Sequence, residues 1–303
     1  MRKLGQYLLA NPVHAMAAAM LCSVLPLLAL PGGFLAGILV GFTTLCRGYK
    51  EGLLVLVGVA IPAVMVTFWK HSFLIDLVLL RCLVVWILAS VLRATTSWRF
   101  VIEIITVIGV IAVIGFYLAI PDVSAWWKAL FSHYQGMFNT LVSGQISEDK
   151  VSQMINDMAP VATGIFIGLI ILLSAFCQSL IARWWQAALY RPGGLGKEFV
   201  EIRSGSVLAT LMTIVVIAAL FHVAIAVDLL PIVIMPLAIA GLCLAHKWVR
   251  QNKKIIYLLV AIYIALIFLP VVVISILALA GYVDSWYDIR KHYIVKNLPK
   301  KGV

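Results

Sequence analysis

The feature that most constrains this chain is a succession of apolar runs, many of them about 20 residues long, that recur along most of its length. A helix of about 20 apolar residues spans the roughly 30 Å hydrocarbon core of a bilayer. Because 64% of the residues are apolar and only 12% are charged, too few polar side chains remain to coat a water-facing surface. A soluble enzyme, a disordered tail and a secreted disulfide scaffold are thereby excluded.

The apolar runs predict an all-α fold, a polytopic transmembrane helical bundle with about eight to nine membrane segments, formed by residues 1–303 as a single transmembrane domain. One run, 33–46, would be only about 21 Å long as a helix, so it needs its flanks to complete a span. The runs are 13–30, 33–46, 52–68, 73–92, 101–120, 161–182, 205–227, 229–245 and 255–281.

Lysine and arginine orient the predicted bundle. With the N-terminus in the cytoplasm, the cytoplasmic segments carry 14 Lys and Arg residues and the outer segments before the tail carry three, as the positive-inside rule requires. The net charge of +11 then reflects anionic lipid headgroups, and no nucleic-acid partner is expected. The basic tail 290–301 breaks the pattern unless 255–281 is a hairpin broken at Pro270. We favour one kinked span, because the apolar tip 267–269 makes a poor turn.

Two hydrophilic regions interrupt the predicted bundle. Residues 121–160 form a long outer loop in which apolar residues recur at helical spacing, so we expect two amphipathic helices at the outer interface. They would pack at the interface or, alternatively, form a lid over a cavity. Residues 183–204 form a basic, glycine-rich loop on the cytoplasmic side.

Small residues recur at four-residue spacing on two predicted helices. Small side chains let helix backbones approach closely inside a membrane. We expect these rows to pack within the chain, and the alternative is a groove for a separate membrane partner. Leu39 is expected on the opposite, lipid-facing side of its helix. The two rows are Gly33, Gly37 and Gly41, and Ala15 and Ala19.

Ionisable groups inside apolar runs are costly in lipid, so they point to functional sites. Arg81 lies eight residues into its run, about 12 Å below the outer end and too deep for easy snorkelling. Asp76, His222 and Asp228 fall in the same outer half. We therefore predict an outward-opening substrate cavity lined by these four residues. The alternative is a structural ion pair that locks helices together.

The glycines of the cytoplasmic loop suggest an anion site. Gly193, Gly194 and Gly196 are spaced so that their backbone N–H groups could form a nest for an anion, between Arg191 and Glu198. A Walker A loop is excluded, because Arg191 stands at the first glycine position and Glu198 replaces Ser or Thr.

The same loop carries a resemblance to a known family. Trp184-x5-Tyr190 followed by Pro-Gly-Gly-x-Gly-x-Glu-Phe-x-x-Ile-Arg resembles the YybS-like family of bacterial membrane proteins, and the turn Arg47-Gly48-x3-Gly52 is similar too. That family is distantly similar to S components of energy-coupling-factor transporters, which capture substrates. The resemblance implies a multi-pass protein of the bacterial cytoplasmic (inner) membrane, and it assigns no catalytic or binding residue.

Two function classes follow from these patterns. Enzyme motifs are absent, and the five cysteines show no metal-ligand spacing, so we expect no catalytic residues, metal or cofactor. The favoured function is a solute transporter, or a substrate-binding transporter subunit, without its own ATPase. The alternative is a non-transporting scaffold or assembly factor that docks partner proteins. The expected partners are the lipid bilayer, a small-molecule substrate and a membrane partner subunit or second copy of the chain.

Overall fold

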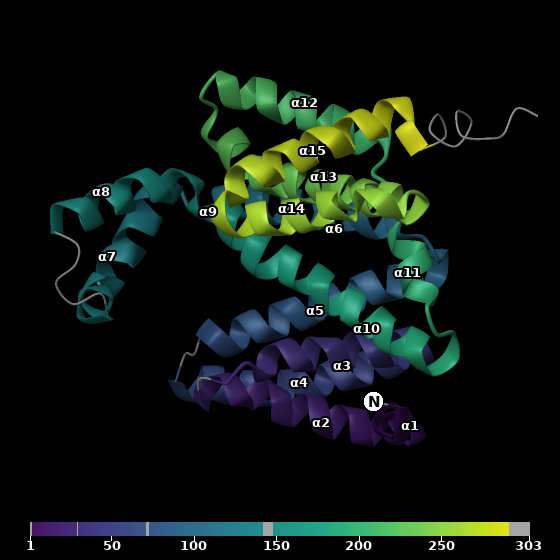
Figure 1. Cartoon of the computed structure of the whole chain (residues 1–303). Coiled ribbons are helices and arrows are strands. Elements are labelled where there is room, and N and C mark those ends of the chain that lie inside the picture. Colours follow the sequence, from purple (N-terminus) through teal and green to yellow (C-terminus); the bar gives the residue numbers. More distant parts are fainter. Residues whose placement is uncertain (1, 29, 71–72, 142–147, 291–303) are drawn as a thin grey trace, which may run out of the picture.

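The computed structural model describes residues 2–28, 30–70, 73–141 and 148–290, and the regular structure within these ranges is helical (Figure 1). The elements are α1 (Arg2–Ala10), α2 (Pro12–Val24), the 3₁₀ turn Leu25–Leu28, α3 (Gly32–Arg47), α4 (Tyr49–Lys70), α5 (Phe73–Thr95), α6 (Trp98–Ala119), α7 (Val123–Leu141), α8 (Glu148–Met158), the 3₁₀ turn Ala159–Val161, α9 (Ala162–Ile165), the π-helix Phe166–Leu173, α10 (Ser174–Tyr190), α11 (Gly194–Phe199), α12 (Ser206–Leu220), α13 (Ala224–Gln251), the 3₁₀ turn Lys253–Ile255, α14 (Ile256–Phe268) and α15 (Pro270–Tyr287).

The helices are those of a multi-pass membrane protein. By length and composition, six of the described helices can cross a membrane, or seven if the bent pair Arg2–Ala10 and Pro12–Leu28 counts as one span. The predicted count of eight to nine membrane segments is not confirmed. The predicted runs 33–46 and 205–227 form α3 and α12, which have 16 and 15 residues and are too short to count as spans. Helix α14, with 13 residues, is also short, but it shares the predicted run 255–281 with α15.

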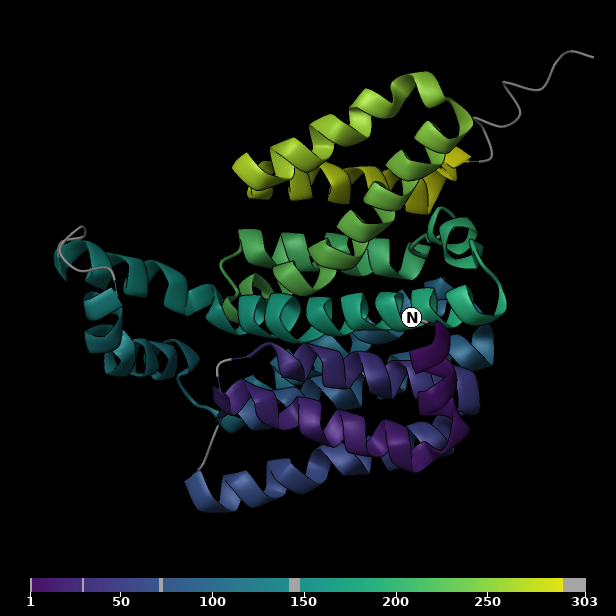
Figure 2. The same cartoon turned by 60° about the horizontal axis from the view of Figure 1, so that its bottom comes forward.

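The helices form two groups with a bridge between them. Helices α2, α3, α4 and α5 pack together, and α12, α14 and α15 pack around α13 (Figures 1 and 2). The bridge consists of α6, which contacts α5 and α13, and of α10, which contacts α3 and α5. The start of α10 continues without a break from α9 and the π-helix, so one long helical segment joins the two groups.

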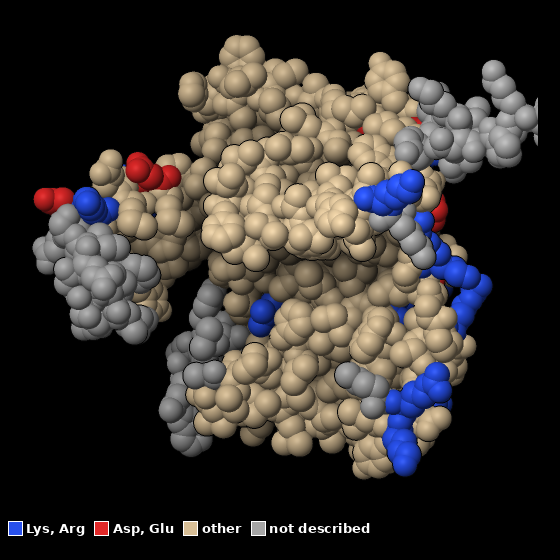
Figure 3. Space-filling model, in the orientation of Figure 1, with Lys and Arg blue, Asp and Glu red and all other residues tan. Residues whose placement is uncertain are grey.

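Segments that the sequence places in the cytoplasm share one end of the bundle, which we call the basic end. It carries α1, the turns 47–49 and 95–98, α11 and the turn 251–255. Guanidinium groups bind backbone carbonyls across these segments: Arg47 donates to Leu9, and Arg93 donates to Leu45. Lys and Arg side chains gather there in Figure 3. The grouping is what the charge pattern predicts for a shared side of the membrane.

The last apolar run is a hairpin, so the single kinked span favoured above is wrong. Helix α14 begins at the basic end and runs to the opposite end, and α15 runs back from Pro270 (Figure 1). Arg290, just beyond α15, donates to the carbonyl oxygens of Val200 and Ile202 at 2.7 and 2.6 Å. The apolar tip 267–269 does not prevent the turn, because lipid, unlike water, tolerates exposed apolar side chains there.

Residues 121–160 contain the two predicted helices, which form an arm that projects from the bundle (Figures 1 and 2). A small separate core of Val123, Trp127, Ala159 and Ala162 fixes the base of the arm. The arm therefore does not lie across the bundle, and only its base can border a site there.

Candidate functional site

Asp228 is the most enclosed ionisable group at the end opposite the basic end, which we call the opposite end. It lies in the second turn of α13, and its side chain has no exposed surface. One carboxylate oxygen, Oδ1, accepts the backbone N–H of Gly164 at 2.8 Å, and Oδ2 accepts the hydroxyl of Tyr117 at 2.8 Å. Hydrogen bonds of this kind are what makes a carboxylate tolerable at such depth.

The backbone of α9 approaches Asp228 closely because residue 164 is glycine. A Cβ at Gly164 would overlap the carbonyl oxygen of Asp228, so any side chain would push α9 and α13 apart. Next to it, the hydroxyl of Thr163 accepts the indole N–H of Trp127 at 2.8 Å. The polar cluster therefore joins α6, α9, α13 and the base of the arm.

The helices around this cluster are irregular. A π-helix, Phe166–Leu173, directly follows α9, and wide turns of this type recur at functional sites. In α13, Pro231 lacks the N–H that would bond the carbonyl of Val227. Gly168 of the π-helix lies against Pro231. The helical segments on both sides of Asp228 therefore depart locally from the regular hydrogen bonding of an α-helix.

A cavity of about 420 Å³ lies beside the cluster. Its lining includes Tyr117 and Val227, the exposed His222 of the turn after α12, and Ser124 at the base of the arm. Tyr117 belongs to both features, because its hydroxyl binds Asp228 while its side chain lines the cavity. One phenol therefore connects the cavity to the buried carboxylate.

The four residues predicted to line one cavity do not do so. Arg81 is half-buried in α5, its Nη2 lies near Gly33 of α3, and its Nε is enclosed without a hydrogen-bond partner in the described part of the chain. Asp76 is exposed on the first turn of α5. Neither lines the cavity beside Tyr117 and His222. The prediction grouped them by depth alone, and depth does not determine which helices are neighbours.

The glycine row on α3 packs inside the chain. A Cβ at Gly33 would meet Val78 of α5, and one at Gly37 would overlap the side chain of Gln178 of α10. Gly41 lies against Val85 and Ala182, and Ala15 and Ala19 of α2 are fully buried. These contacts favour packing within the chain over a groove for a separate partner.

Two residues near this row differ from expectation. Leu39 is 7% exposed and not lipid-facing, because α2 and α4 pack on α3 in addition to α5 and α10. Gln178, which the sequence analysis did not single out, is fully buried, and both polar atoms of its amide lack a hydrogen-bond partner among the described residues. A polar residue within an apolar run was the available signal.

The predicted anion nest in the cytoplasmic loop is not formed. Gly193 has the left-handed φ of +78° that a nest needs, but the N–H of Gly194 donates to the carbonyl of Arg191 at 3.0 Å. Gly196 lies within the helix α11. The loop instead continues into the short helix α11, whose backbone N–H groups lie parallel to the helix axis and do not converge on one anion.

Glu198 of α11 holds the loop to the bundle. Its carboxylate accepts from Arg183 of α10 and, at 3.2 Å, from the indole N–H of Trp98 of α6. Partial burial opposes its ionisation, but the hydrogen bonds from Arg183 and Trp98 and the charges of Arg183 and Arg191 outweigh burial and lower the pKa of Glu198.

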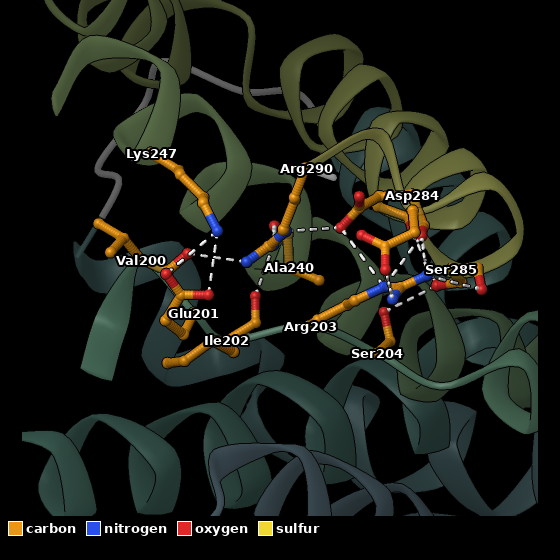
Figure 4. A network of polar contacts seen from close by, with 12 residues as sticks. Val200, Glu201, Ile202, Arg203, Ser204, Ala240, Lys247, Asp284, Ser285 and Arg290 are labelled. Atoms are coloured by element: carbon orange, nitrogen blue, oxygen red, sulfur yellow. Dashed lines mark hydrogen bonds and ion pairs between the residues drawn. The ribbon is translucent and has the colours of Figure 1, made fainter. Parts of the chain in front are cut away.

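A second buried charge cluster, also missed, closes the basic end (Figure 4). Asp284 of α15 has no exposed surface, and its Oδ2 accepts from Arg290 Nε at 2.8 Å. Arg290 also donates to the carbonyl oxygen of Ala240, and Arg203 donates to that of Asp284. The network joins α13, α15 and the segment 200–204.

Comparison with protein-family models, with curated proteins and with solved structures finds no match for the chain. The resemblance to the YybS-like family stays a prediction. Among the described residues, no group of three or more His, Cys, Asp and Glu side chains is placed to hold a metal ion.

Proposed function

We propose that this protein moves a small solute across the bacterial cytoplasmic membrane, as a transporter or as the substrate-binding subunit of one, without its own ATPase. One observation carries the proposal: the enclosed carboxylate of Asp228 is linked by the hydroxyl of Tyr117 to a cavity at the opposite end of the bundle. A carboxylate buried within a membrane bundle without a cation beside it is typical of coupling groups in transporters.

The proposed mechanism uses the hydrogen bonds of Asp228. A solute that accepts a hydrogen bond from the Tyr117 hydroxyl competes with Asp228 for that donor. Asp228 would then take a proton or accept from a new donor. Either change weakens the hydrogen bond from the N–H of Gly164 to the carboxylate, so α9 can move away from α13. The adjacent π-helix and Pro231 allow the two helices to shift at low cost. The driving energy comes from an ion gradient or from a separate ATPase subunit.

A scaffold or assembly factor is the second candidate, and the projecting arm α7–α8 favours it. An arm held only at its base offers surface to another protein. The two functions place the important residues differently: at Asp228 and Tyr117 for transport, and along the arm for docking.

The test compares the small-molecule contents of cells that produce wild-type protein or Asp228→Asn at equal levels in the membrane. We expect at least one solute to differ several-fold between the two. The control is Asp157→Asn, which also removes one negative charge, but from an exposed carboxylate on α8. Identical profiles for wild type and Asp228→Asn, with a change in Asp157→Asn, would instead favour the scaffold.

A further inference from the structure

A second cavity, of about 400 Å³, lies at the basic end between the start of α6 and the loop that carries α11. Its α6 side consists of Thr96, Ser97, Trp98 and Arg99, and its loop side of Arg191, Gly194, Lys197, Glu198 and Glu201. No part of the proposed transport site lies here, because Asp228 and Tyr117 belong to the opposite end.

The charges that line this cavity do not cancel. Its two carboxylates are already bound by cations outside the lining: Glu198 by Arg183, and Glu201 by Lys247 at 3.0 Å. The side chains of Arg191 and Lys197 are exposed, and neither forms an ion pair or hydrogen bond with the described residues, although the charge of Arg191 acts on Glu198. Two positive charges thus face the cavity without acceptors of their own.

A third cation and a helix start add to this field. Arg99 bonds Glu103 at 2.9 Å but remains more than half exposed, so it keeps donors for another acceptor. Ser97 begins α6 without a side-chain cap, so no side chain of Ser97 satisfies the first backbone N–H groups of this 22-residue helix, and its first residues line the cavity. Acceptors that satisfy all of these donors together are the oxygens of a phosphate group.

By the composition of α6, the cavity lies at the expected depth of lipid headgroups. The apolar span of α6 begins at Trp98, which is 4% exposed and lines the cavity. Tryptophan favours the boundary between headgroups and hydrocarbon, and basic pockets between transmembrane helices on the cytoplasmic side suit anionic headgroups.

We propose that this cavity is a binding site for a phosphate group, held by Arg191, Lys197 and Arg99 against the start of α6. The phosphate comes either from the headgroup of an anionic phospholipid or from a soluble phosphate compound, and the two sources share this recognition chemistry.

The test removes the two free charges in Arg191→Gln/Lys197→Gln. Both side chains are exposed, so the fold is retained. The matched control is Lys3→Gln/Lys254→Gln, which removes two exposed charges from the same end but outside the cavity. In one arm, native mass spectrometry compares the binding of phosphatidylglycerol with that of phosphatidylcholine. In the other arm, thermal unfolding in phosphatidylcholine nanodiscs measures how far inorganic phosphate and pyrophosphate stabilise each variant.

Each cation should contribute about 1 kcal/mol of binding free energy. We therefore expect the cavity variant to bind one of these probes with roughly thirtyfold lower affinity, while the control binds as the wild type does. Loss in the phosphatidylglycerol arm identifies a lipid site, and loss in the phosphate arm identifies a soluble ligand. Equal losses in the two variants would show diffuse attraction to a basic surface and overturn the proposal. No binding of any probe to the wild type, or full binding to the cavity variant, would also overturn it.

Discussion

Asp284 and Asp228 are both fully buried carboxylates in transmembrane helices, one at each end of the bundle, and they are held in different ways. Asp284 lies beside Arg290 and Arg203, whose other donors bind backbone carbonyls and, from Arg203, the carboxylate of Asp288 (Figure 4). Asp228 is held by a phenol and a backbone amide, both neutral. A carboxylate paired to cations locks the helices, whereas one held by neutral donors can change its partners. This difference is the reason that we place the proposed solute site beside Asp228 and not beside Asp284.

The largest effect is expected from Gly241→Leu, which breaks the frame of the basic end. A Cβ at Gly241 of α13 would overlap the carbonyl oxygen of Leu277 of α15, so backbone and not only side chains must move. We expect a loss of at least about 3 kcal/mol in stability and poor monodispersity after purification. Gly115→Leu on α6 is the control, because a Cβ there meets nothing within 4 Å.

Asp284→Asn tests the buried ion pair itself. It leaves the guanidinium of Arg290, which is 5% exposed, without its counter-charge, so we expect a loss of about 3–5 kcal/mol. The comparison is Glu201→Gln, which breaks the pair with Lys247 at a carboxylate that is 65% exposed and should cost less than about 1 kcal/mol. Similar unfolding midpoints for the two variants would contradict a structural role for Asp284.

Asp228→Asn should cost less stability than Asp284→Asn although both positions are fully buried. The amide oxygen of Asn still accepts from Gly164, and its nitrogen can donate to the Tyr117 oxygen, so we expect a loss of about 1 kcal/mol. Thermal unfolding in nanodiscs measures both variants side by side. A larger loss for Asp228→Asn would show that its charge, too, holds the fold.

The smallest effect is a pH dependence at Glu198. Because its pKa is lowered from the ordinary value of 4.5, the stability that its charge contributes is complete above that value. It is lost only as the pH falls through the lowered pKa of the folded state. The difference in unfolding midpoint between wild type and Glu198→Gln should therefore be constant from about pH 8 to 5.5 and shrink in stronger acid. A difference that shrinks near pH 6.5 would contradict this assignment.

The sequence was sufficient for features that depend on composition and local spacing. Apolar runs predicted the helices, and the Lys and Arg pattern grouped the segments that meet at the basic end. Intramembrane charge singled out Asp228 as a candidate, and four-residue spacing found the close approach of Gly33, Gly37 and Gly41 to their neighbours.

Features that depend on which distant segments meet were not predictable in this way. Arg290 is bound by the carbonyls of Val200, Ile202 and Ala240, which carry no side-chain signal in the sequence. The link from Asp228 to the cavity depends on Tyr117, 111 residues away on another helix. Arg81 and Asp228 share a predicted depth, but they lie on helices that face different neighbours.

The account is tested most directly by solute-dependent thermal stability. A solute identified in the cell comparison is added to wild type, Asp228→Asn and Glu201→Gln in nanodiscs. At about 100 times its dissociation constant, a bound solute stabilises the folded state by about 2.7 kcal/mol. We predict this stabilisation in the wild type and in Glu201→Gln, and its loss in a folded Asp228→Asn. Stabilisation of Asp228→Asn equal to that of the wild type would contradict the assignment of the solute site to the opposite end.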